Sequence, residues 1–380
     1  MKNKTEQSQG KEEFDLKKNE RNTKGAAAGK KKKGGKLAYV LTSLMGVMVI
    51  LLSVGYGVFH HYYSKLNTSK FSDDPNAYDI SDTDLKISDA DLKALDETLY
   101  QDLGDGLVFD ERNVTNIILV GTDSRSRGNK RTRSDAMILV SINRNTKKII
   151  MTSFMRDMYV AIPNKKDNHN RLNTAFAYGG PDLLFQTIDT NFGIKIEKYA
   201  HIDFYNFIDL VDAVGGVDLE VNKGELDVVN YYYLPELNAA LKDPPGTDVI
   251  PGKGGMTHLN GKQALAYTRV RYYGNGDFER TERQRKVLTQ IFQKAKQMSV
   301  SELNKLADVV LPMISTNLTQ GEVMSLIVNS PEYLTYDLES HRIPIDGSFA
   351  YTEAGNASVL GVNFKMNRKY WYETVYGSAD

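Results

Sequence analysis

The chain has 380 residues, and its 48 Lys and Arg residues balance 48 Asp and Glu residues to a net charge of zero. This length is enough for one large domain or two small ones. The absence of cysteine excludes a disulfide framework, a zinc–thiolate site and a thiol nucleophile.

The N-terminal part of the chain is first basic and then apolar. Residues 1–36 contain the lysine run Lys30–Lys33 and no apolar periodicity, which predicts a disordered basic tail. The segment Leu37–Phe59 has no charged residue over about 23 positions, enough to cross a bilayer of about 30 Å. Because the lysines precede it, we expect a single-pass signal-anchor helix in the cell membrane, with the tail cytoplasmic and the remaining chain extracellular. The alternatives are a nucleic-acid patch for the lysines and a buried soluble helix for the apolar segment.

The segment 60–112 is acidic, with aspartates recurring from Asp73 to Asp91. Residues Ser88–Tyr100 are consistent with one helix that has Ser88 as its N-cap. We expect this segment to be a solvated stalk or a small accessory element.

A main domain is expected over residues 113–345. Its first part contains three short apolar runs rich in β-branched residues, typical of buried strands. These runs are Val114–Val120, Ala136–Ile142 and Ile149–Phe154, and the turn Asn143–Lys147 joins the last two in a hairpin. A charged residue stands at the end of each run, namely Asp123, Asp135 and Arg156. If the strands are neighbours, two carboxylates and a guanidinium meet at one sheet edge, which suggests a divalent metal and a phosphate.

Helices and strands then alternate, which predicts an α/β domain with an α/β/α layered arrangement. We expect helices at Pro181–Phe192 and Phe204–Val214, and strands at Tyr199–Ile202 and Val217–Val221. The stretch Asn222–Gly255 contains Pro, Gly and a run of tyrosines, which indicates a long loop.

The stretch His258–Leu288 is the second one rich in candidate site residues. Arg269 and Arg271 stand two apart, so they point the same way if the segment is extended. Asp277 is the expected N-cap of a helix to Gln297, with Arg280 and Gln284 on its buried stripe. Buried polar groups in a first helical turn need partners, and a bound phosphate supplies them. Further expected elements are helices at Ser301–Ser315 and Gln320–Val328, a strand at His341–Ile345, and a C-terminal tail over 346–380.

The chemistry open to these residues is that of hard cations and phosphates. Asp123 and Asp135 offer only oxygen ligands, which favour Mg²⁺ or Mn²⁺. Guanidinium groups bind phosphate oxygens in pairs, so the arginines are candidates for a pyrophosphate, with surface salt bridges as the alternative for any one of them. The histidines at 169, 201, 258 and 341 lack metal-ligand spacing, so we expect them to be structural or exposed.

Several blocks of the sequence resemble the LytR-CpsA-Psr family, and they follow its order over Val114–Gln297. They are NIILVGTDSR, RSDAMILVSIN, MRDMYV, RLNTAFAYGG, DLVDAVGGVDLEV, HLNGKQALAYTRVR and DFERTERQR. The resemblance implies a membrane-anchored phosphotransferase of Gram-positive bacteria. Such an enzyme moves a glycopolymer from an undecaprenyl-pyrophosphate carrier to peptidoglycan through a phosphodiester, assisted by Mg²⁺ or a similar ion. The implied fold is an α/β/α sandwich with a central mixed sheet and an apolar tunnel for the polyprenyl chain.

The resemblance also assigns roles to residues of this chain. Asp123 and Asp135 match the metal ligands. The residues that match the pyrophosphate site are Arg133, Arg156, Arg269, Arg271, Arg280 and Gln284. The implied catalytic residues are Asp123, Asp135, Arg156, Arg269, Arg271 and Asp277, and the general base stays open between Asp277 and Asp135. Tunnel-lining candidates, for which ordinary core is the favoured interpretation, are Phe176, Leu184, Ile188, Phe207 and Val211. The chain departs from the family by having Ser153-Phe154-Met155 where an Ile/Val-Pro pair is commoner, from which we expect altered packing and unchanged chemistry.

Two other functions use the same residues. With water as the acceptor, the site is that of a polyprenyl-pyrophosphate hydrolase. Without turnover, the protein is a lipid-binding regulator of cell-envelope genes. DNA binding is not expected, because only about 36 residues are cytoplasmic and they show no helix-turn-helix pattern. The sequence leaves open whether the polymer is teichoic acid, capsule or a related polysaccharide.

Overall fold

The computed structural model describes residue 57 and residues 59–68, 113–123, 132–163, 169–355 and 357–377. The chain divides into two compact units, residues 1–60 and 61–380. The predicted basic tail, almost all of the membrane helix and the acidic segment beyond residue 68 lie outside the described residues. Within the described ranges, no helix is both long and apolar enough to cross a bilayer.

The second unit is built on a mixed six-stranded sheet in the order β10-β3-β2-β1-β6-β9. Its strands are β1 Val114–Thr122, β2 Ser134–Asn143, β3 Lys148–Phe154, β6 Tyr199–Asp203, β9 Ser315–Thr316 and β10 Asp337–Ile343. Strands β1, β2 and β3 pair antiparallel in sequence order, whereas β6 joins β1 and β10 joins β3 in parallel. The predicted hairpin of β2 and β3 is therefore confirmed, and β1 lies beside it.

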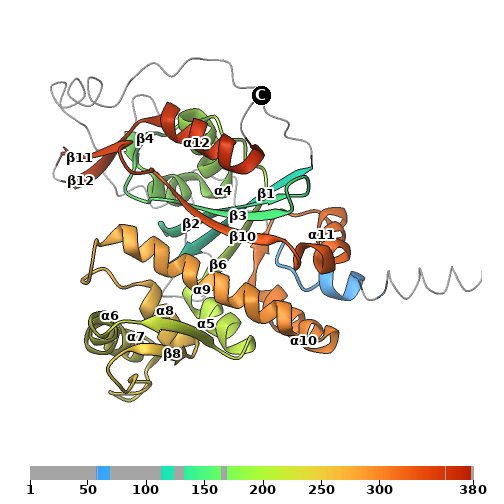
Figure 1. Cartoon of the computed structure of the whole chain (residues 1–380), viewed down its shortest axis with the longest axis vertical. Helices are drawn as coiled ribbons and strands as arrows, with labels where there is room; N and C mark the ends of the chain where they lie inside the picture. The colour runs from blue at the N-terminus through green and yellow to red at the C-terminus, as the bar shows by residue number, and fades with distance from the viewer. Residues whose placement is uncertain are drawn as a thin grey trace, which may run out of the picture. The chain divides into compact units, whose positions relative to one another are not determined.

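Helices cover both faces of this sheet, so the predicted α/β/α layering is also confirmed (Figure 1). One face carries α4 Leu172–Phe192 and α12 Phe364–Tyr376. The other carries α5 Phe204–Ala213, α8 Gly261–Thr268 and α9 Asp277–Gln297. Three two-stranded ribbons complete the fold: β4 Tyr159–Ala161 with β5 His169–Arg171, β7 Val217–Val221 with β8 Gly255–Leu259, and β11 Phe349–Ala354 with β12 Ala357–Val362.

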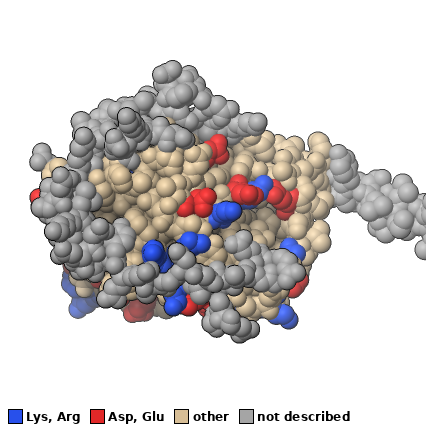
Figure 2. Space-filling view, turned by 90° about the horizontal axis from the view of Figure 1, so that it is seen from above, with Lys and Arg blue, Asp and Glu red and all other residues tan. Residues whose placement is uncertain are grey.

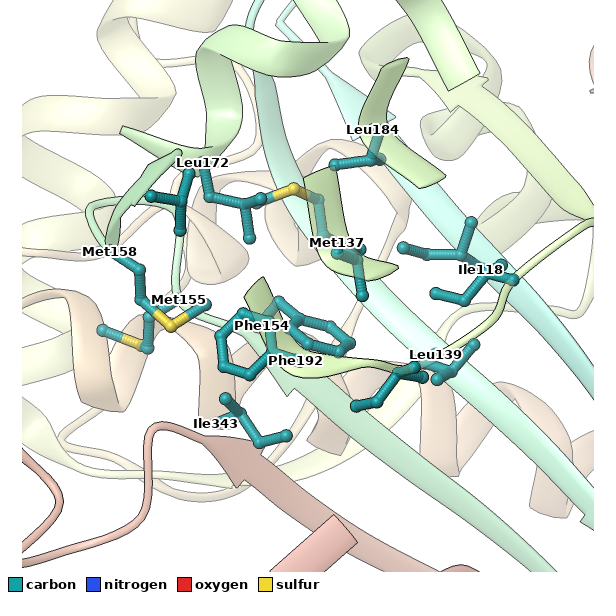
Figure 3. Close-up of a cluster of buried hydrophobic side chains, with 14 of the residues drawn as sticks. Ile118, Met137, Leu139, Phe154, Met155, Met158, Leu172, Leu184, Phe192 and Ile343 are labelled. Atoms are coloured by element: carbon teal, nitrogen blue, oxygen red, sulfur yellow. The ribbon is translucent and has the colours of Figure 1, made fainter. Parts of the chain in front are cut away.

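The main core lies between the sheet and α4 (Figure 3). Alternate residues of β1 and β2 point into it, among them Ile118 and Leu139, which are completely buried. Leu184 and Phe192 of α4 belong to the same cluster, in which Phe192 lies beside Phe154 (Figure 3). Each such side chain contributes about 1.5–3 kcal/mol by leaving water, so this layer anchors the strands whose ends carry the charged residues.

A second core lies between α5, α8 and the β7–β8 ribbon. The helices α5 and α8 approach closely at Gly261, where an added Cβ atom would stand 2.1 Å from the carbonyl oxygen of Ile208. Only glycine fits at this contact. The close approach lets α8 bring its C-terminal end to the sheet, where Arg269 follows.

The prediction of a long loop at Asn222–Gly255 is wrong, because most of this segment is helical. The structure has α6 Lys223–Val228, a π-helical turn Val229–Tyr233 and α7 Leu234–Leu241. Asn222 and Glu225 cap the first helix reciprocally, each side chain accepting from the other's backbone N–H. Pro235 stands in the first turn of α7, where its missing N–H costs no hydrogen bond.

The prediction of a C-terminal tail over 346–380 is also wrong, because this segment contains β11, β12 and α12. Trp371 and Val375 of α12 are 1% and 0% exposed and belong to the main core. Asn143 Nδ2 of β2 donates to the carbonyl oxygen of Val375 at 2.7 Å. The apolar residues of this segment therefore complete the domain.

Smaller differences concern element ends. α4 begins at Leu172 and is kinked at Gly179 and Gly180, so the predicted start at Pro181 is the start of its second half. The predicted Ser301–Ser315 helix is α10 Val300–Val310, which a 3-10 turn Leu311–Met313 follows before β9. α11 spans Gln320–Tyr333 and so extends beyond the expected end at Val328. β10 starts at Asp337, before the expected start at His341.

The charges of the described residues are mixed on the surface that Figure 2 shows. Acidic and basic residues lie next to one another across the middle of this face. The net charge of the chain is zero, and on this face charges of opposite sign also lie close together.

Candidate active site

A cavity of about 370 Å³ lies between the sheet and the helices of its second face. It is lined by Gly121, Asp123, Asp135, Ala136, Ile138, Arg156, Ile202, Asp203, Phe204, Phe207, Tyr233, Glu236, Leu265, Thr268, Arg269, Arg271, Tyr272, Arg280, Gln284 and Leu288. Along β2 the lining changes from Asp135 to Ile138, and along α9 it changes from Arg280 to Leu288. One end of the cavity is therefore charged and its continuation is apolar.

A β-bulge directs Asp135 into this cavity. In the pairing of β1 with β2, Gly121 faces Ala136 and Thr122 faces Ser134, so Asp135 is the extra residue. In a regular strand Asp135 and Ala136 would point to opposite faces, yet both line the cavity. The bulge thus places the carboxylate of Asp135 near the end of β1, where Asp123 follows.

Three guanidinium groups surround the Asp135 carboxylate. Arg156 Nη1 donates to its Oδ1 atom at 2.7 Å. Arg280 Nη1 and Arg271 Nη2 lie 3.6 and 3.9 Å from the same atom. They come from the turn after β3, from α9 and from the segment after α8, so three separate parts of the chain meet at this carboxylate.

Asp277 binds the same three arginines. Its carboxylate lies 3.0 Å from Arg280 Nε, 3.2 Å from Arg271 Nε and 3.5 Å from Arg156 Nη2. It is the first residue of α9 and not the N-cap, which is Gly276 with a positive φ of 56°. Burial by itself raises the pKa of Asp277, but the charges of Arg280 and Arg156 hold it below its usual value. The carboxylate therefore stays ionised at neutral pH.

The cluster retains capacity for an anion. Arg280 is 3% exposed, and burial together with the Arg156 charge lowers its pKa to about 10. The Nε atoms of Arg156 and Arg280 are buried and make no hydrogen bond of normal geometry within the described residues. Three guanidinium groups gather at the Asp135 and Asp277 carboxylates, and Asp157 pairs with Arg156 from its other side. Several buried guanidinium groups converging on one cavity are typical of a phosphate-binding site.

Arg269 is held separately, at the end of α8. Its Nη2 atom lies 3.1 Å from Glu236 Oε1 and 3.8 Å from Asp123 Oδ2. Its guanidinium carbon stands 5.3 Å from the ring centres of both Phe204 and Tyr233. These ring contacts stabilise the cation and fix its direction toward the cavity. Glu236 and Tyr233 were not among the predicted site residues, because a loop was expected in their segment.

The structure brings most of the predicted site residues together. Asp123, Asp135, Arg156, Arg269, Arg271, Arg280 and Gln284 line the cavity, and Asp277 contacts three of them. Arg133, just before β2, is exposed and does not belong to the lining among the described residues. The roles assigned to all of these residues remain predictions. Asp157 and Arg171, which pair at 3.5 Å next to Arg156, were missed as site residues.

The oxygen donors of Asp123 and Asp135 are of the type that a hard divalent cation takes, and a cation at this site remains a prediction. Asp123 and Asp135 stand at the ends of paired strands and line one cavity. Among the described residues, three or more His, Asp or Glu side chains do not gather in a group that would form a complete protein cage for a metal. Mg²⁺ typically takes one or two carboxylates and completes its shell with water and substrate phosphates, so two carboxylates suffice.

The candidates for the tunnel divide between cavity and core. Phe207 lines the cavity, whereas Phe176, Leu184 and Ile188 belong to the main core and Val211 to the second. For these four residues the core interpretation is the right one. The apolar part of the cavity is formed instead by residues of β2, β6, α5, α8 and α9, namely Ile138, Ile202, Phe204, Phe207, Leu265 and Leu288.

The chain is similar in sequence and in fold to known proteins. The LytR_cpsA_psr family model matches residues 70–374. Biofilm regulatory protein A of Streptococcus mutans is 34% identical over 269 residues, which cover 65% of this chain and 63% of that protein. The polyisoprenyl-teichoic acid–peptidoglycan teichoic acid transferase TagU of Oceanobacillus iheyensis is 31% identical over 256 residues, covering 64% of this chain and 72% of that protein. A solved structure described as TagT bound to LIIa-WTA aligns with a TM-score of 0.54 and 25% identity, covering 70% of this chain and 92% of that one.

Proposed function

This chain belongs to the LytR-CpsA-Psr family, and we propose that it transfers a glycopolymer from a polyprenyl-pyrophosphate carrier to peptidoglycan. The observation that carries the proposal is one cavity with an arginine-rich charged end and an apolar continuation. A pyrophosphate joined to an isoprenoid chain has the same two chemical halves. The name of the TagU relative describes a transfer of this kind.

The proposed reaction is a displacement at phosphorus. An acceptor hydroxyl on peptidoglycan attacks the phosphorus nearer the glycan, forming a new P–O bond. The P–O bond to the lipid phosphate breaks, so polyprenyl monophosphate leaves and the glycan becomes attached through a phosphodiester. The hydroxyl proton passes to a carboxylate, for which Asp277 and Asp135 are the candidates, and then to water.

The arginines bind the pyrophosphate and stabilise the charge that develops during this step. Arg156, Arg271 and Arg280 are already oriented by Asp135 and Asp277, so little reorganisation is needed when the substrate binds. Gln284 adds an amide donor one turn further along α9. Removing one such oriented donor typically lowers the rate by about 10²–10³.

The proposal includes a divalent cation, Mg²⁺ or Mn²⁺, held by Asp123 and Asp135. When bound, such an ion supplies Lewis-acid stabilisation of the phosphate oxygens. The chain's own contribution is to keep Asp135 in the bulge and Asp123 at the end of β1, both facing the cavity.

The proposal also places the enzyme at the cell surface. Leu37–Phe59 would anchor it in the membrane as a single helix, with the basic N-terminus in the cytoplasm and the catalytic domain outside. Its partners are then the lipid-linked glycan, peptidoglycan and the bilayer, and nucleic acid is not among them.

Two other functions are retained. A hydrolase uses the same site with water as the acceptor. A non-enzymatic regulator binds the lipid without turnover, and the name of the Streptococcus mutans relative is the finding that favours this alternative.

The test uses the full-length protein in detergent micelles with labelled polyprenyl-pyrophosphate glycan and peptidoglycan oligomers. Asp135→Ala and Arg269→Ala are compared with Lys286→Ala, an exposed cation of α9 outside the cavity lining. Each reaction is run with and without Mg²⁺.

The expected result is metal-dependent label on peptidoglycan, lost in the two site variants and kept in Lys286→Ala. Free phosphorylated glycan without transfer would favour the hydrolase. Tight lipid binding without turnover for several polymers would favour the regulator.

A further inference from the structure

A second cavity, of about 430 Å³, adjoins the first through Arg156, which lines both. The Nη1 atom of Arg156 binds Asp135 in the first cavity, and its Nε atom lies 3.4 Å from Asp157 Oδ2 in the second. The lining of the second cavity also includes Arg171, Asp277 and Tyr351. The two cavities therefore meet at one guanidinium group.

The C-terminal hairpin forms one wall of this second cavity. Leu360 donates its backbone N–H to the carbonyl oxygen of Asp157 at 2.9 Å, and Arg171 Nη2 donates to the carbonyl oxygen of Ser358 at 2.9 Å. The opposite part of the lining is the Gly274–Gly276 turn before α9. The hairpin is thus fixed directly to the segment that carries Arg156, so this wall is preorganised.

The polar atoms of the second cavity are held in ion pairs that lack hydrogen-bond geometry. Arg156 Nε and Arg171 Nε lie 3.4 and 3.5 Å from the Asp157 carboxylate, and Asp277 Oδ1 lies 3.0 Å from Arg280 Nε. Within the described residues, none of these three buried atoms makes a hydrogen bond of normal geometry. Two of them are donors and the third is an acceptor, so the cavity offers a ligand polar groups of both kinds.

The charges that line the second cavity are balanced. Arg156 and Arg171 face Asp157 and Asp277, so two positive charges meet two negative ones. Burial and the neighbouring Asp277 raise the pKa of Asp157, although the Arg156 charge opposes this. A cavity with balanced charge, and with donors and acceptors side by side, suits a neutral polyhydroxyl compound.

Tyr351 adds an aromatic surface at this cavity. Its side chain is 64% exposed, although it is a large and partly apolar residue. The face of an exposed tyrosine ring packs against apolar C–H surface, while its hydroxyl stays in contact with water. Sugar rings present such C–H surface together with the hydroxyl groups that the arginines and aspartates bind.

We propose that the second cavity binds the saccharide of the acceptor, and that it presents the attacking hydroxyl to the phosphate held at Arg156. This inference rests on the proposed function. In a displacement at phosphorus the attacking oxygen enters away from the leaving oxygen. The leaving lipid phosphate belongs to the first cavity with its apolar continuation, so the acceptor enters through the second. The bonds formed and broken are those of the transfer described above, and no further reactant is needed.

The test measures acceptor binding and acceptor kinetics separately. Full-length protein in detergent micelles is titrated with soluble peptidoglycan oligomers, and then with polyprenyl pyrophosphate. Tyr351→Ala and Asp157→Asn are the test variants. Tyr231→Ala is the matched control, because Tyr231 is an equally exposed tyrosine, 75% exposed, outside both cavity linings.

We expect Tyr351→Ala to weaken oligomer binding and to raise the acceptor KM by about three- to tenfold, the usual size of one aromatic contact. Its Kd for polyprenyl pyrophosphate and its thermal unfolding temperature should not change. Asp157→Asn should weaken oligomer binding similarly, and Tyr231→Ala should behave as wild type.

Several results would overturn the inference. These are unchanged acceptor binding and KM in both test variants, competition between oligomers and polyprenyl pyrophosphate, or no oligomer binding by the wild type. Oligomer binding that depends on Tyr351, in a protein that transfers to no acceptor, would support the saccharide site while refuting the proposed transferase.

Discussion

Replacing Arg283 of α9 tests how the active-site segment is held in place. Arg283 is 1% exposed, and its Nε atom donates to Glu225 Oε1 at 2.7 Å. Its Nη1 atom donates to the carbonyl oxygen of Val270 at 3.0 Å, and its Nη2 atom to that of Tyr273 at 3.4 Å. Val270 and Tyr273 stand on either side of Arg271 in the sequence, so one buried guanidinium fixes the segment that presents Arg271 to the cavity.

The expected loss of stability in Arg283→Met is large, because the substitution leaves a buried partner behind. Arg283→Met keeps much of the side-chain volume but leaves Glu225, 6% exposed, without its cation. Removing one member of a buried ion pair typically costs about 3–5 kcal/mol. Glu225→Gln costs less, because Arg283 keeps Glu279 at 2.7 Å and the two carbonyl groups. The double variant should be more stable than the two single losses predict, since no buried charge is left unpaired; Glu279, the other partner of Arg283, is 38% exposed.

The assay is urea unfolding followed by fluorescence of Trp371, the one tryptophan of the sequence, which is buried in the main core. Lys286→Met is the control on the same helix. Its exposed pair with Glu282 should be worth about 0.3–0.5 kcal/mol. Arg283→Met should also weaken polyprenyl-pyrophosphate binding, because Arg271 loses its support. The reasoning is refuted if Arg283→Met costs less than about 1 kcal/mol, or if the single effects simply add in the double variant.

Three further predictions concern stability. Burial lowers the pKa of His201 to about 4 despite the nearby Asp203, and its ring hydrogen-bonds Thr122 Oγ1 at 2.9 Å. The unfolded chain therefore takes up a proton between pH 6.5 and 4 that the folded chain does not, and going from pH 7 to pH 5 should cost about 2 kcal/mol. Urea unfolding at both pH values should show this loss in the wild type and a smaller one in His201→Gln. Gly261→Ala should lower the free energy of unfolding by about 1–3 kcal/mol, because it forces α8 away from α5. Gly321→Ala, where an added Cβ meets nothing within 4 Å, should raise it by about 0.5–1 kcal/mol. Thermal unfolding of the two variants measures both changes. Trp371→Ala should lower the free energy of unfolding by about 3–5 kcal/mol, measured by unfolding followed with circular dichroism. A loss below about 1 kcal/mol would mean that the packing of α12 is not needed for stability.

The local pattern of the sequence was enough to predict the first three strands of the central sheet and most of its charged edge. β1, β2 and β3 have short β-branched runs with a tight turn between the last two, so their pairing follows from near neighbours in the chain. Asp123, Asp135 and Arg156 come together because each directly adjoins one of these strands. Arg280 and Gln284 followed from helical periodicity in the same way.

Weak or mixed local signals produced the errors. In Asn222–Gly255 the prolines and glycines suggested a loop, but the Asn222–Glu225 capping box and the burial of Leu226 and Val229 stabilise helices. The segment 346–380 lacks a long periodic run, and its helix is stabilised chiefly by packing Trp371 into the main core.

The tertiary structure alone decided which residues line which cavity. Phe176 and Phe207 both belong to apolar helix segments, but only Phe207 lies on the cavity side of the sheet. Arg171, Asp277 and Tyr351 come from distant parts of the chain and meet only when β5, α9 and β11 pack together. Sequence periodicity identifies the buried face of an element, because that depends on its own repeat. It does not identify what that face meets, because the partner is set by packing between segments far apart in the chain.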